Sequence, residues 1–279
     1  MKIGFLANGE MFGWEPKKLM SFIKETGYDS VELIDDIIFA DGKDAKDFRA
    51  AADEYGVTIS EILTQHDFVL KNAEQTAKNA DLVIENMKKA ADIGVNIVNV
   101  FTGPVPWMPD AIKVGKQVSM SEAWSDVFSA FDKIVPAAEK LGVKVAVENV
   151  WGMLAHDFYT NKFLNEHYES DNLGVNLDPS HDALYGNTDT AFLVKSWGKK
   201  VFHVHLKDAV GIAEDGKFIF PLIGEGIVNF KALFDALKEI GYDGTCSVEF
   251  ESWAYRANTL GGVHSAAAAP MLEAVKKYL

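Results

Sequence analysis

The sequence predicts an α/β protein, a single-domain (β/α)8 TIM barrel over residues 1–279. Strand-like and helix-like segments alternate along the chain, which is typical of a parallel sheet covered by helices. Eight strand-like segments can be read from the sequence, and eight such units close a barrel of this kind. The length agrees as well, because these barrels commonly reach about 250 residues as one domain.

The junctions between helices and strands give the element boundaries. A helical run, a glycine and a β-rich run recur as one phrase, for example KETGYDSVEL (24–33) and EKLGVKVAVEN (139–149). Glycine just past a helix end adopts the left-handed conformation without a Cβ clash, and the β-branched and aromatic residues after it favour a strand. The expected strands are 2–7, 30–34, 58–65, 96–103, 144–149, 173–178, 201–206 and 245–251. The expected helices are 16–26, 45–55, 82–93, 128–141, 190–197, 229–240 and 268–279, with a capping-box helix start at SMSE (119–122).

An open, doubly wound sheet is the alternative architecture. Its nucleotide-binding versions carry a glycine-rich phosphate loop after the first strand. The corresponding stretch here, ANGEMFG (7–13), has neither the GxGxxG nor the GxxxxGK[ST] spacing. The chain also has no Pro/Gly-rich linker that would divide it into two domains.

The composition limits the partners and the compartment. A net charge of −14 repels polyanions and argues against nucleic acid and anionic membranes as partners. No apolar run approaches the roughly 18 residues of a membrane span, and the apolar stretch of MKIGFLANGE is too short for a signal peptide. The single cysteine, Cys246, excludes an intramolecular disulfide, which favours a reducing compartment. We therefore expect a cytoplasmic protein, and a homo-oligomer stays open.

Ionisable residues recur where the last four predicted strands end. Glu148, Asp178, His205 and Glu249 follow or end these strands, and catalytic groups of such barrels lie at this edge. Three carboxylates gathered there repel one another unless a cation neutralises them. An oxygen-rich site with one imidazole suits one divalent metal ion, with Mn²⁺ favoured and Mg²⁺, Co²⁺ or Zn²⁺ as alternatives. Taken singly, each of the four residues could instead be a salt-bridge partner, a turn former or a hydrogen-bonded core residue.

Other residues near this edge are candidates for substrate contact. His181 and Lys207 follow two of these strands and could bind substrate, although either could be an ordinary loop residue. Trp14 and Trp107 fall in expected loops at the same edge, where aromatic rings suit the C–H surfaces of a sugar, although each ring could instead serve only in packing. His203 lies deeper on the same face as His205 and is interpreted as structural, while Glu251 is an alternative at the rim. Glu32 and His66 are weaker candidates.

The ordered phrases VAVEN, NLDPSH, HVHLKD, IGEG and GTCSVEFE resemble the xylose isomerase-like barrel family. That family includes sugar epimerases, sugar-phosphate isomerases and type IV AP endonucleases. The resemblance implies that Glu148, Asp178, His205 and Glu249 bind the metal and that His181 contacts substrate. The nuclease branch carries an Asp-x-His before the Gly-x-Gly, where this chain has Phe218 and Phe220, and a further histidine that TGPVPWMPD (102–110) lacks. A DNA-cutting site is therefore disfavoured.

These observations predict a metal-dependent isomerase or epimerase of a small-molecule carbohydrate. The reaction is proton abstraction next to a carbonyl through a metal-stabilised enediolate. Glu249 removes a proton from one face and Glu148 returns one to the other, which epimerises the substrate; one carboxylate serving both steps would instead give aldose–ketose isomerisation. The alternatives are a lyase or hydratase acting on a keto-sugar or keto-glycoside, a nuclease, and an inert sugar-binding barrel.

Overall fold

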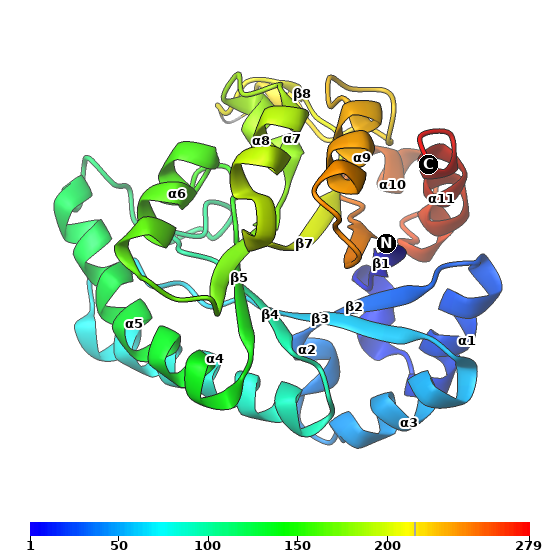
Figure 1. Ribbon diagram of the computed structural model, residues 1–279, viewed down its shortest axis with the longest axis horizontal. Coiled ribbons are helices and arrows are strands. Elements are labelled where there is room, and N and C mark those ends of the chain that lie inside the picture. The colour runs from blue at the N-terminus through cyan, green and yellow to red at the C-terminus, as the bar shows by residue number, and fades with distance from the viewer. Residues whose placement is uncertain (215) are drawn as a thin grey trace.

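Eight parallel strands close into a barrel in the order β1–β10–β7–β6–β5–β4–β3–β2, so the predicted (β/α)8 TIM barrel is confirmed (Figure 1). The computed structural model describes residues 1–214 and 216–279. The first and last strands pair directly, with Lys2 in register with Thr245 and Phe5 with Val248. The strands are β1 (Lys2–Leu6), β2 (Ser30–Ile34), β3 (Thr58–Thr64), β4 (Ile97–Val100), β5 (Lys144–Glu148), β6 (Leu173–Leu177), β7 (Val201–Leu206) and β10 (Thr245–Val248).

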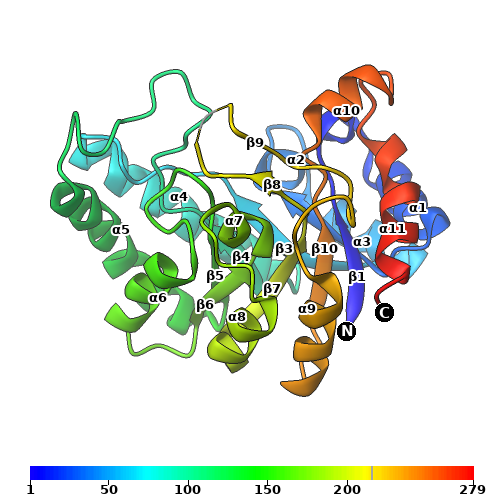
Figure 2. The same cartoon turned by 90° about the horizontal axis from the view of Figure 1, so that it is seen from above.

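The helices lie around the outside of the barrel (Figures 1 and 2). Neighbouring helices pack in pairs, α1 with α3, α4 with α5, and α8 with α9. In Figure 2 the two termini lie together at one edge, whereas β9 and α10 lie at the opposite edge, toward which β1 runs. The helices are α1 (Pro16–Thr26), α2 (Asp35–Ile38), α3 (Ala45–Tyr55), α4 (Ala73–Asp92), α5 (Met120–Leu141), α6 (Phe158–His167), α7 (Pro179–Leu184), α8 (Thr190–Trp197), α9 (Phe230–Glu239), α10 (Trp253–Asn258) and α11 (Ala268–Lys276). Short 3-10 turns are η1 (Gly9–Gly13), η2 (Gly198–Lys200) and η3 (Ser265–Ala267), and a small antiparallel pair is formed by β8 (Val210–Gly211) and β9 (Phe218–Ile219).

The helix ends form as the sequence patterns predict. Ser119 caps α5 by accepting a hydrogen bond from the Glu122 backbone, and the Glu122 side chain accepts one from the Ser119 backbone. Gly27 and Gly142 end α1 and α5 with φ of 100° and 66°, the left-handed region that glycine enters without strain. The chain then enters β2 and β5 after short connections, so the predicted αβ junctions are confirmed.

Several boundaries differ from the sequence-based expectations. Strands β4 and β10 end at Val100 and Val248, earlier than expected, because the chain there leaves the barrel for loops at its rim. Helix α4 begins at Ala73, nine residues before the expected position 82, because Asn72 caps its first turn by accepting a hydrogen bond from the Gln75 backbone. Helix α6 was not predicted, because its sequence FYTNKFLNEH is rich in residues of modest helix propensity and is only weakly amphipathic.

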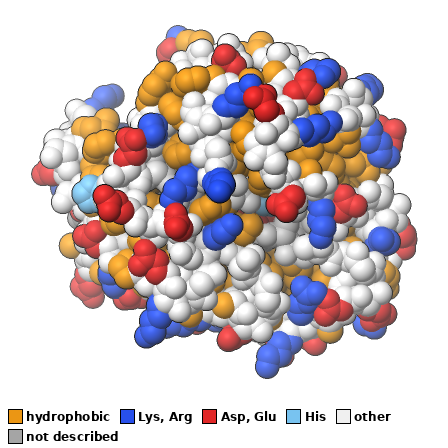
Figure 3. Space-filling view, viewed as in Figure 1, with side chains coloured by type: hydrophobic (Ala, Val, Ile, Leu, Met, Phe, Trp, Pro, Cys, Tyr) orange, Lys and Arg blue, Asp and Glu red, His pale blue; other side chains and the backbone are white. Residues whose placement is uncertain are grey.

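The surface mixes charges of both signs. On the face shown in Figure 3, acidic and basic side chains are interspersed with apolar ones. Among the described residues, no helix combines the length and the apolar character needed to cross a membrane.

Asp208, directly after β7 and Lys207, holds the loop that contains the IGEG phrase. Its buried carboxylate accepts hydrogen bonds from the backbone N–H groups of Ala209 and Val228 (2.9 and 3.0 Å) and of Gly224 and Gly226 (2.9 and 2.8 Å). A Cβ atom at Gly226 would collide with this carboxylate, which explains the glycine there. The loop after β7 is therefore organised around one buried anion.

Asp208→Ala should destabilise the protein, because four backbone N–H groups lose their acceptor. Each orphaned buried donor costs about 1–3 kcal/mol when water cannot replace the partner, so we expect a loss of about 3 kcal/mol or more. The measurement is the urea-unfolding midpoint, with Asp235→Ala as the control because that carboxylate contacts Lys231 on the surface. Equal midpoints for the two variants would contradict this role for Asp208.

Candidate active site

The structure brings together the four residues that the sequence analysis placed at the strand ends. Glu148 ends β5, Asp178 follows β6, His205 lies in β7 and Glu249 follows β10. One ligand atom from each lies within 4.8 Å of the others, and all four side chains are buried. The barrel geometry explains this, because neighbouring parallel strands end at the same rim.

His205 lies at the centre of this cluster. Its Nδ1 atom is 3.0 Å from Glu148 Oε1 and 3.1 Å from Glu249 Oε2, and its Nε2 atom is 3.0 Å from Glu32 Oε1. Burial opposes a charge on the imidazole, but the carboxylates of Glu148, Glu32 and Glu249 together raise the pKa of His205 well above its usual value. One ring nitrogen therefore faces the strand-end carboxylates and the other faces the barrel interior.

Lys207 brings a second cationic group to the cluster. Its Nζ atom is 2.7 Å from Glu249 Oε2, 2.9 Å from Glu251 Oε2, 3.0 Å from Asp178 Oδ2 and 3.1 Å from His181 Nε2. Burial disfavours the ammonium, but Asp178, Glu249 and Glu251 raise the pKa of Lys207 well above its usual value. Lys207 is thus an integral member of the cluster.

Two neighbours of Lys207, Asp178 and His181, have lowered pKa values. Burial raises the pKa of Asp178, but the charges of Lys207 and His205 and the hydrogen bond from Ser180 outweigh it and hold the pKa at about 2. Burial and the neighbouring Lys207 lower the pKa of His181 well below its usual value, so this imidazole is neutral. His181 Nδ1 is buried and has no hydrogen-bond partner among the described residues.

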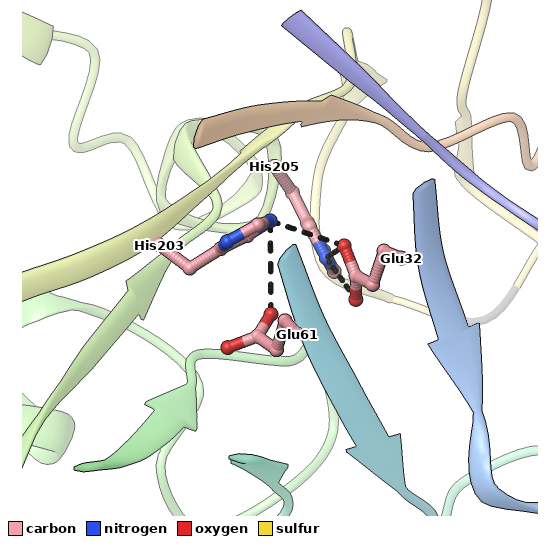
Figure 4. A group of neighbouring side chains, drawn as sticks. All are labelled: Glu32, Glu61, His203 and His205. Atoms are coloured by element: carbon pink, nitrogen blue, oxygen red, sulfur yellow. Dashed lines mark hydrogen bonds and ion pairs between the residues drawn. The ribbon is translucent and has the colours of Figure 1, made fainter. Parts of the chain in front are cut away.

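A second group of side chains lies beneath His205 inside the barrel (Figure 4). Glu32 from β2 is paired in register with Glu61 from β3, and His203 Nε2 is 3.1 Å from Glu32 Oε2 and 2.8 Å from Ser247 Oγ. Burial alone would raise the pKa of Glu32, but His205 and His203 hold it far below its usual range. Burial and the charge of Glu32 raise the pKa of Glu61 well above its usual value. His203 is thus placed in the interior, as its structural interpretation requires.

Sequence reasoning treated Glu32 as a weak candidate and missed Glu61. The available signal was one acidic residue within an otherwise strand-like run, SVELI for Glu32 and TISEILT for Glu61. Both side chains are fully buried, which is rare for a glutamate unless it is paired. Strand registers, unknown from the sequence, were needed to align them with the histidines of β7.

The cluster contains more acidic groups than cationic ones. His205 and Lys207 are its cationic members, because the pKa of each is raised. Within residues 1–214 and 216–279, Asp178 Oδ2 makes no hydrogen bond, and the Lys207 ion pair compensates its charge. Carboxylates with one imidazole are a donor set that binds divalent cations, so these residues fit such an ion. The acidic members at the rim are Glu148, Asp178, Glu249 and Glu251, and Glu32 lies beneath them.

The other two predicted substrate residues lie in different surroundings. Trp107 is 48% exposed and lines a small cavity of about 40 Å³ together with His181, Lys207, Glu249 and other residues. Trp14 lies apart from this group: its ring packs edge-on against Phe22, with Lys18 Nζ 4.0 Å from the ring centre. The cluster, the cavity and Trp107 therefore form one site, and Trp14 packs beside α1. His66 is also outside this cluster, with Nε2 3.4 Å from Asp35 Oδ2.

The closed barrel and the acidic cluster at its strand ends define a TIM-barrel protein with a site suited to a divalent cation. The chain belongs to the xylose isomerase-like TIM barrel family, whose model matches residues 20–269. It is 29% identical to the inosose isomerase of Bacillus subtilis over 184 residues, 62% of each chain.

Solved structures with the same fold include two that are similar over nearly the whole chain. The 3-keto-D-glucoside 4-epimerase YcjR from E. coli has a TM-score of 0.78 at 18% identity, covering 99% of both chains. An IolI protein with a bound zinc atom has a TM-score of 0.77 at 21% identity, covering 100% of this chain and 99% of the other.

Lys207→Met should destabilise the protein in the presence of a chelator, because it removes a buried cation from among several carboxylates. The expected loss is about 3–5 kcal/mol, as for breaking a buried ion pair. Since the pKa of Lys207 is raised, its contribution is fully present below the usual lysine pKa and is lost only as the pH rises through the higher folded value. Urea unfolding at neutral pH therefore measures it in full.

The control for Lys207 is Lys195→Met, which removes an exposed partner of Glu239 and should leave the midpoint unchanged. Adding Mn²⁺ should reduce the deficit of the Lys207 variant, because the added cation offsets the same carboxylates. A Lys207→Met variant as stable as the native chain in chelator would refute this charge balance.

Proposed function

We propose that the chain is a divalent-metal-dependent isomerase or epimerase of a sugar or sugar derivative. The observation that carries the proposal is the convergence of Glu148, Asp178, His205 and Glu249 at the strand ends. The inosose isomerase and the keto-glucoside epimerase among the similar proteins support a carbohydrate substrate. Phe218 and Phe220 provide apolar rings where the nuclease alternative requires metal ligands, which disfavours that alternative.

Glu148, Asp178, His205 and Glu249 would hold the cation. The zinc bound to the similar IolI protein supports a divalent ion, and the ligand set suits Mn²⁺, Mg²⁺, Co²⁺ or Zn²⁺. When bound, the ion supplies positive charge beside the carbonyl oxygen, where negative charge develops during proton abstraction.

Glu32 would set the tautomer of His205. A metal-binding histidine usually donates its second ring N–H to a carboxylate, which fixes the ring and raises its basicity. With Glu32 accepting from Nε2–H, loss of the Nδ1 proton would leave His205 the lone pair at Nδ1 that holds the cation. Asn99 similarly orients Glu148, since its Nδ2 donates to Glu148 Oε2 at 2.9 Å.

The two glutamates would move the proton. Glu249 removes a proton from the carbon next to the carbonyl, and Glu148 returns one to the opposite face, which inverts that carbon. If Glu249 alone removes the proton from one carbon and returns it to the adjacent carbon, the result is aldose–ketose isomerisation. The Lys207 ammonium fixes Glu249 through the 2.7 Å ion pair, and neutral His181 is available to hydrogen-bond a substrate hydroxyl.

Metal dependence is the first test of this proposal. Chelation should abolish exchange of the substrate C–H with ²H₂O, and Mn²⁺, Co²⁺, Mg²⁺ or Zn²⁺ should restore it. Calorimetric titration should show strongly weakened metal binding in Asp178→Asn and His205→Ala, and a loss of about 10–100-fold in Glu32→Gln, the positioning carboxylate.

Glu61→Gln is the matched control for Glu32→Gln. Glu61 makes no hydrogen bond to His205, so its replacement should leave metal affinity close to that of the native chain. Full exchange activity in a demonstrably metal-free preparation would reject the assignment of the site.

The roles of the two glutamates can be separated with saturating metal and substrate. Glu249→Gln should lose both C–H exchange and net conversion by about 10²–10⁴-fold, because the amide cannot accept the proton. Glu148→Gln should keep exchange on the face that Glu249 serves while losing inversion. NMR in ²H₂O on a panel of ketoses and keto-sugars measures both quantities.

Glu239→Gln, on the far surface, serves as the control and should behave as the native chain. Near-normal exchange in Glu249→Gln with metal bound would move the base to Glu148, Glu251 or His181. Signals of a dehydrated sugar or of a free aglycone in the same spectra would identify a lyase or hydratase instead.

A further inference from the structure

A wide cavity lies over the small cavity that borders the catalytic cluster. It measures about 960 Å³, against about 40 Å³ for the inner one. The two cavities are adjacent, because they share lining residues. A pocket of this size is at the upper end of the range, about 300–1,000 Å³, that encloses drug-sized ligands. The shared residues are Asn8, Gln65, Trp107, Trp151 and Glu251.

Aromatic side chains form a row that leads from this outer cavity to the reaction site. The ring centres of Trp151 and Phe218 are 4.7 Å apart, those of Phe218 and Phe220 are 5.3 Å apart, and those of Phe220 and His181 are 5.4 Å apart. Lys207 Nζ lies 4.7 Å from the Phe220 ring centre. The positions at which the nuclease branch would place an Asp-x-His therefore form an apolar wall in this chain.

The outer cavity also exposes large apolar side chains. Trp107 and Trp253 are 48% and 46% exposed, and Phe12, from the 3-10 turn after β1, is 37% exposed. Exposed apolar groups gathered in one concave region are typical of a binding site. Burying such surface is favourable by about 25 cal/mol per Å², so an apolar group seated here would contribute to binding.

The charges of the lining do not favour a phosphate. Among the described residues that line the outer cavity, Lys113 and Glu251 are the charged ones. Lys207, at the floor, already pairs with three carboxylates. Tight phosphate recognition generally uses several charge-assisted donors, and these residues supply one unpaired cation at most.

We propose that the outer cavity is a subsite for an uncharged, aromatic-sized substituent carried by the sugar, so that the substrate is an apolar glycoside rather than a free or phosphorylated sugar. This inference rests on the proposed function for the position of the reacting sugar. The reacting carbons of the sugar lie at the inner cavity beside the cluster, the rest of the ring extends into the outer cavity, and the substituent lies between Trp107, Phe218 and Trp253.

The test compares phenyl and methyl glycosides of the same 3-keto-glucose with the Mn²⁺-loaded protein. The kcat/KM for C–H exchange should be about 10–100-fold higher for the phenyl glycoside, the range expected for burying one aromatic ring. Trp253→Ala and Phe12→Ala should each lower this phenyl-to-methyl ratio at least threefold. Phe163→Ala removes an exposed aromatic ring of α6 that packs edge-on against Trp124, and it should leave the ratio unchanged.

A binding measurement keeps the subsite testable if the chemistry proposed above is wrong. Tryptophan fluorescence should report tighter binding of phenyl than of methyl β-glucoside, with the same loss in Trp253→Ala. If neither keto-glycoside exchanges but this preference holds, the subsite stands and the isomerase proposal fails. A phenyl-to-methyl ratio near one in the native chain would overturn the subsite. Tighter binding of glucose 6-phosphate than of phenyl β-glucoside would also overturn it. So would sedimentation that shows a dimer which Trp253→Ala dissociates, because the cavity would then be a contact between two copies of the chain.

Discussion

The excess of buried carboxylates around His205 is the constraint on which the rest of this structure depends. Barrel interiors of this type are usually filled by layers of branched apolar side chains. Here Glu32, Glu61 and His203 occupy the interior beneath the strand-end cluster, and each is fully buried. Such charges are tolerated when each has a counter-charge or a hydrogen-bond donor in fixed geometry. His205 meets that requirement for Glu32, and Lys207 meets it for the carboxylates at the rim, whereas Glu61 has a raised pKa that favours its neutral form.

The barrel supplies the precision that this arrangement needs. The four convergent residues are far apart in the sequence, but each is fixed by the end of one strand, and the strands are held in register by their neighbours. Loops alone would not hold side chains to such tolerances. The buried Asp208 carboxylate extends this order to the loop after β7, because it accepts hydrogen bonds from the backbone of that loop. The same loop carries Phe218 and Phe220 over the site. Rigid strands therefore position the chemistry, and anchored loops form the walls.

Sequence reasoning could find the barrel and the four convergent residues because both depend on local periodicity. Alternating apolar runs and glycine junctions mark the strands, and a polar residue at a strand end stands out against them. Glu61 and the importance of Glu32 depend on strand register, which local patterns do not encode. Trp14 and Trp107 were both expected in loops that follow strands. The contacts of Trp14 with Phe22 and Lys18 hold it beside α1, which the local sequence pattern does not indicate. Helix α6 was missed because tertiary packing stabilises a segment of weak intrinsic propensity.

The direct pairing of β1 with β10 has a consequence for how the chain acquires its site during synthesis. One edge of β1 stays without its partner until residues 245–248 have been made, and Glu249 follows immediately. An incomplete chain thus presents an open sheet with exposed strand edges, which favours association with other chains. The last strand closes the sheet, and the last of the four convergent residues follows it directly. Closure and completion of the site are therefore a single late step in folding.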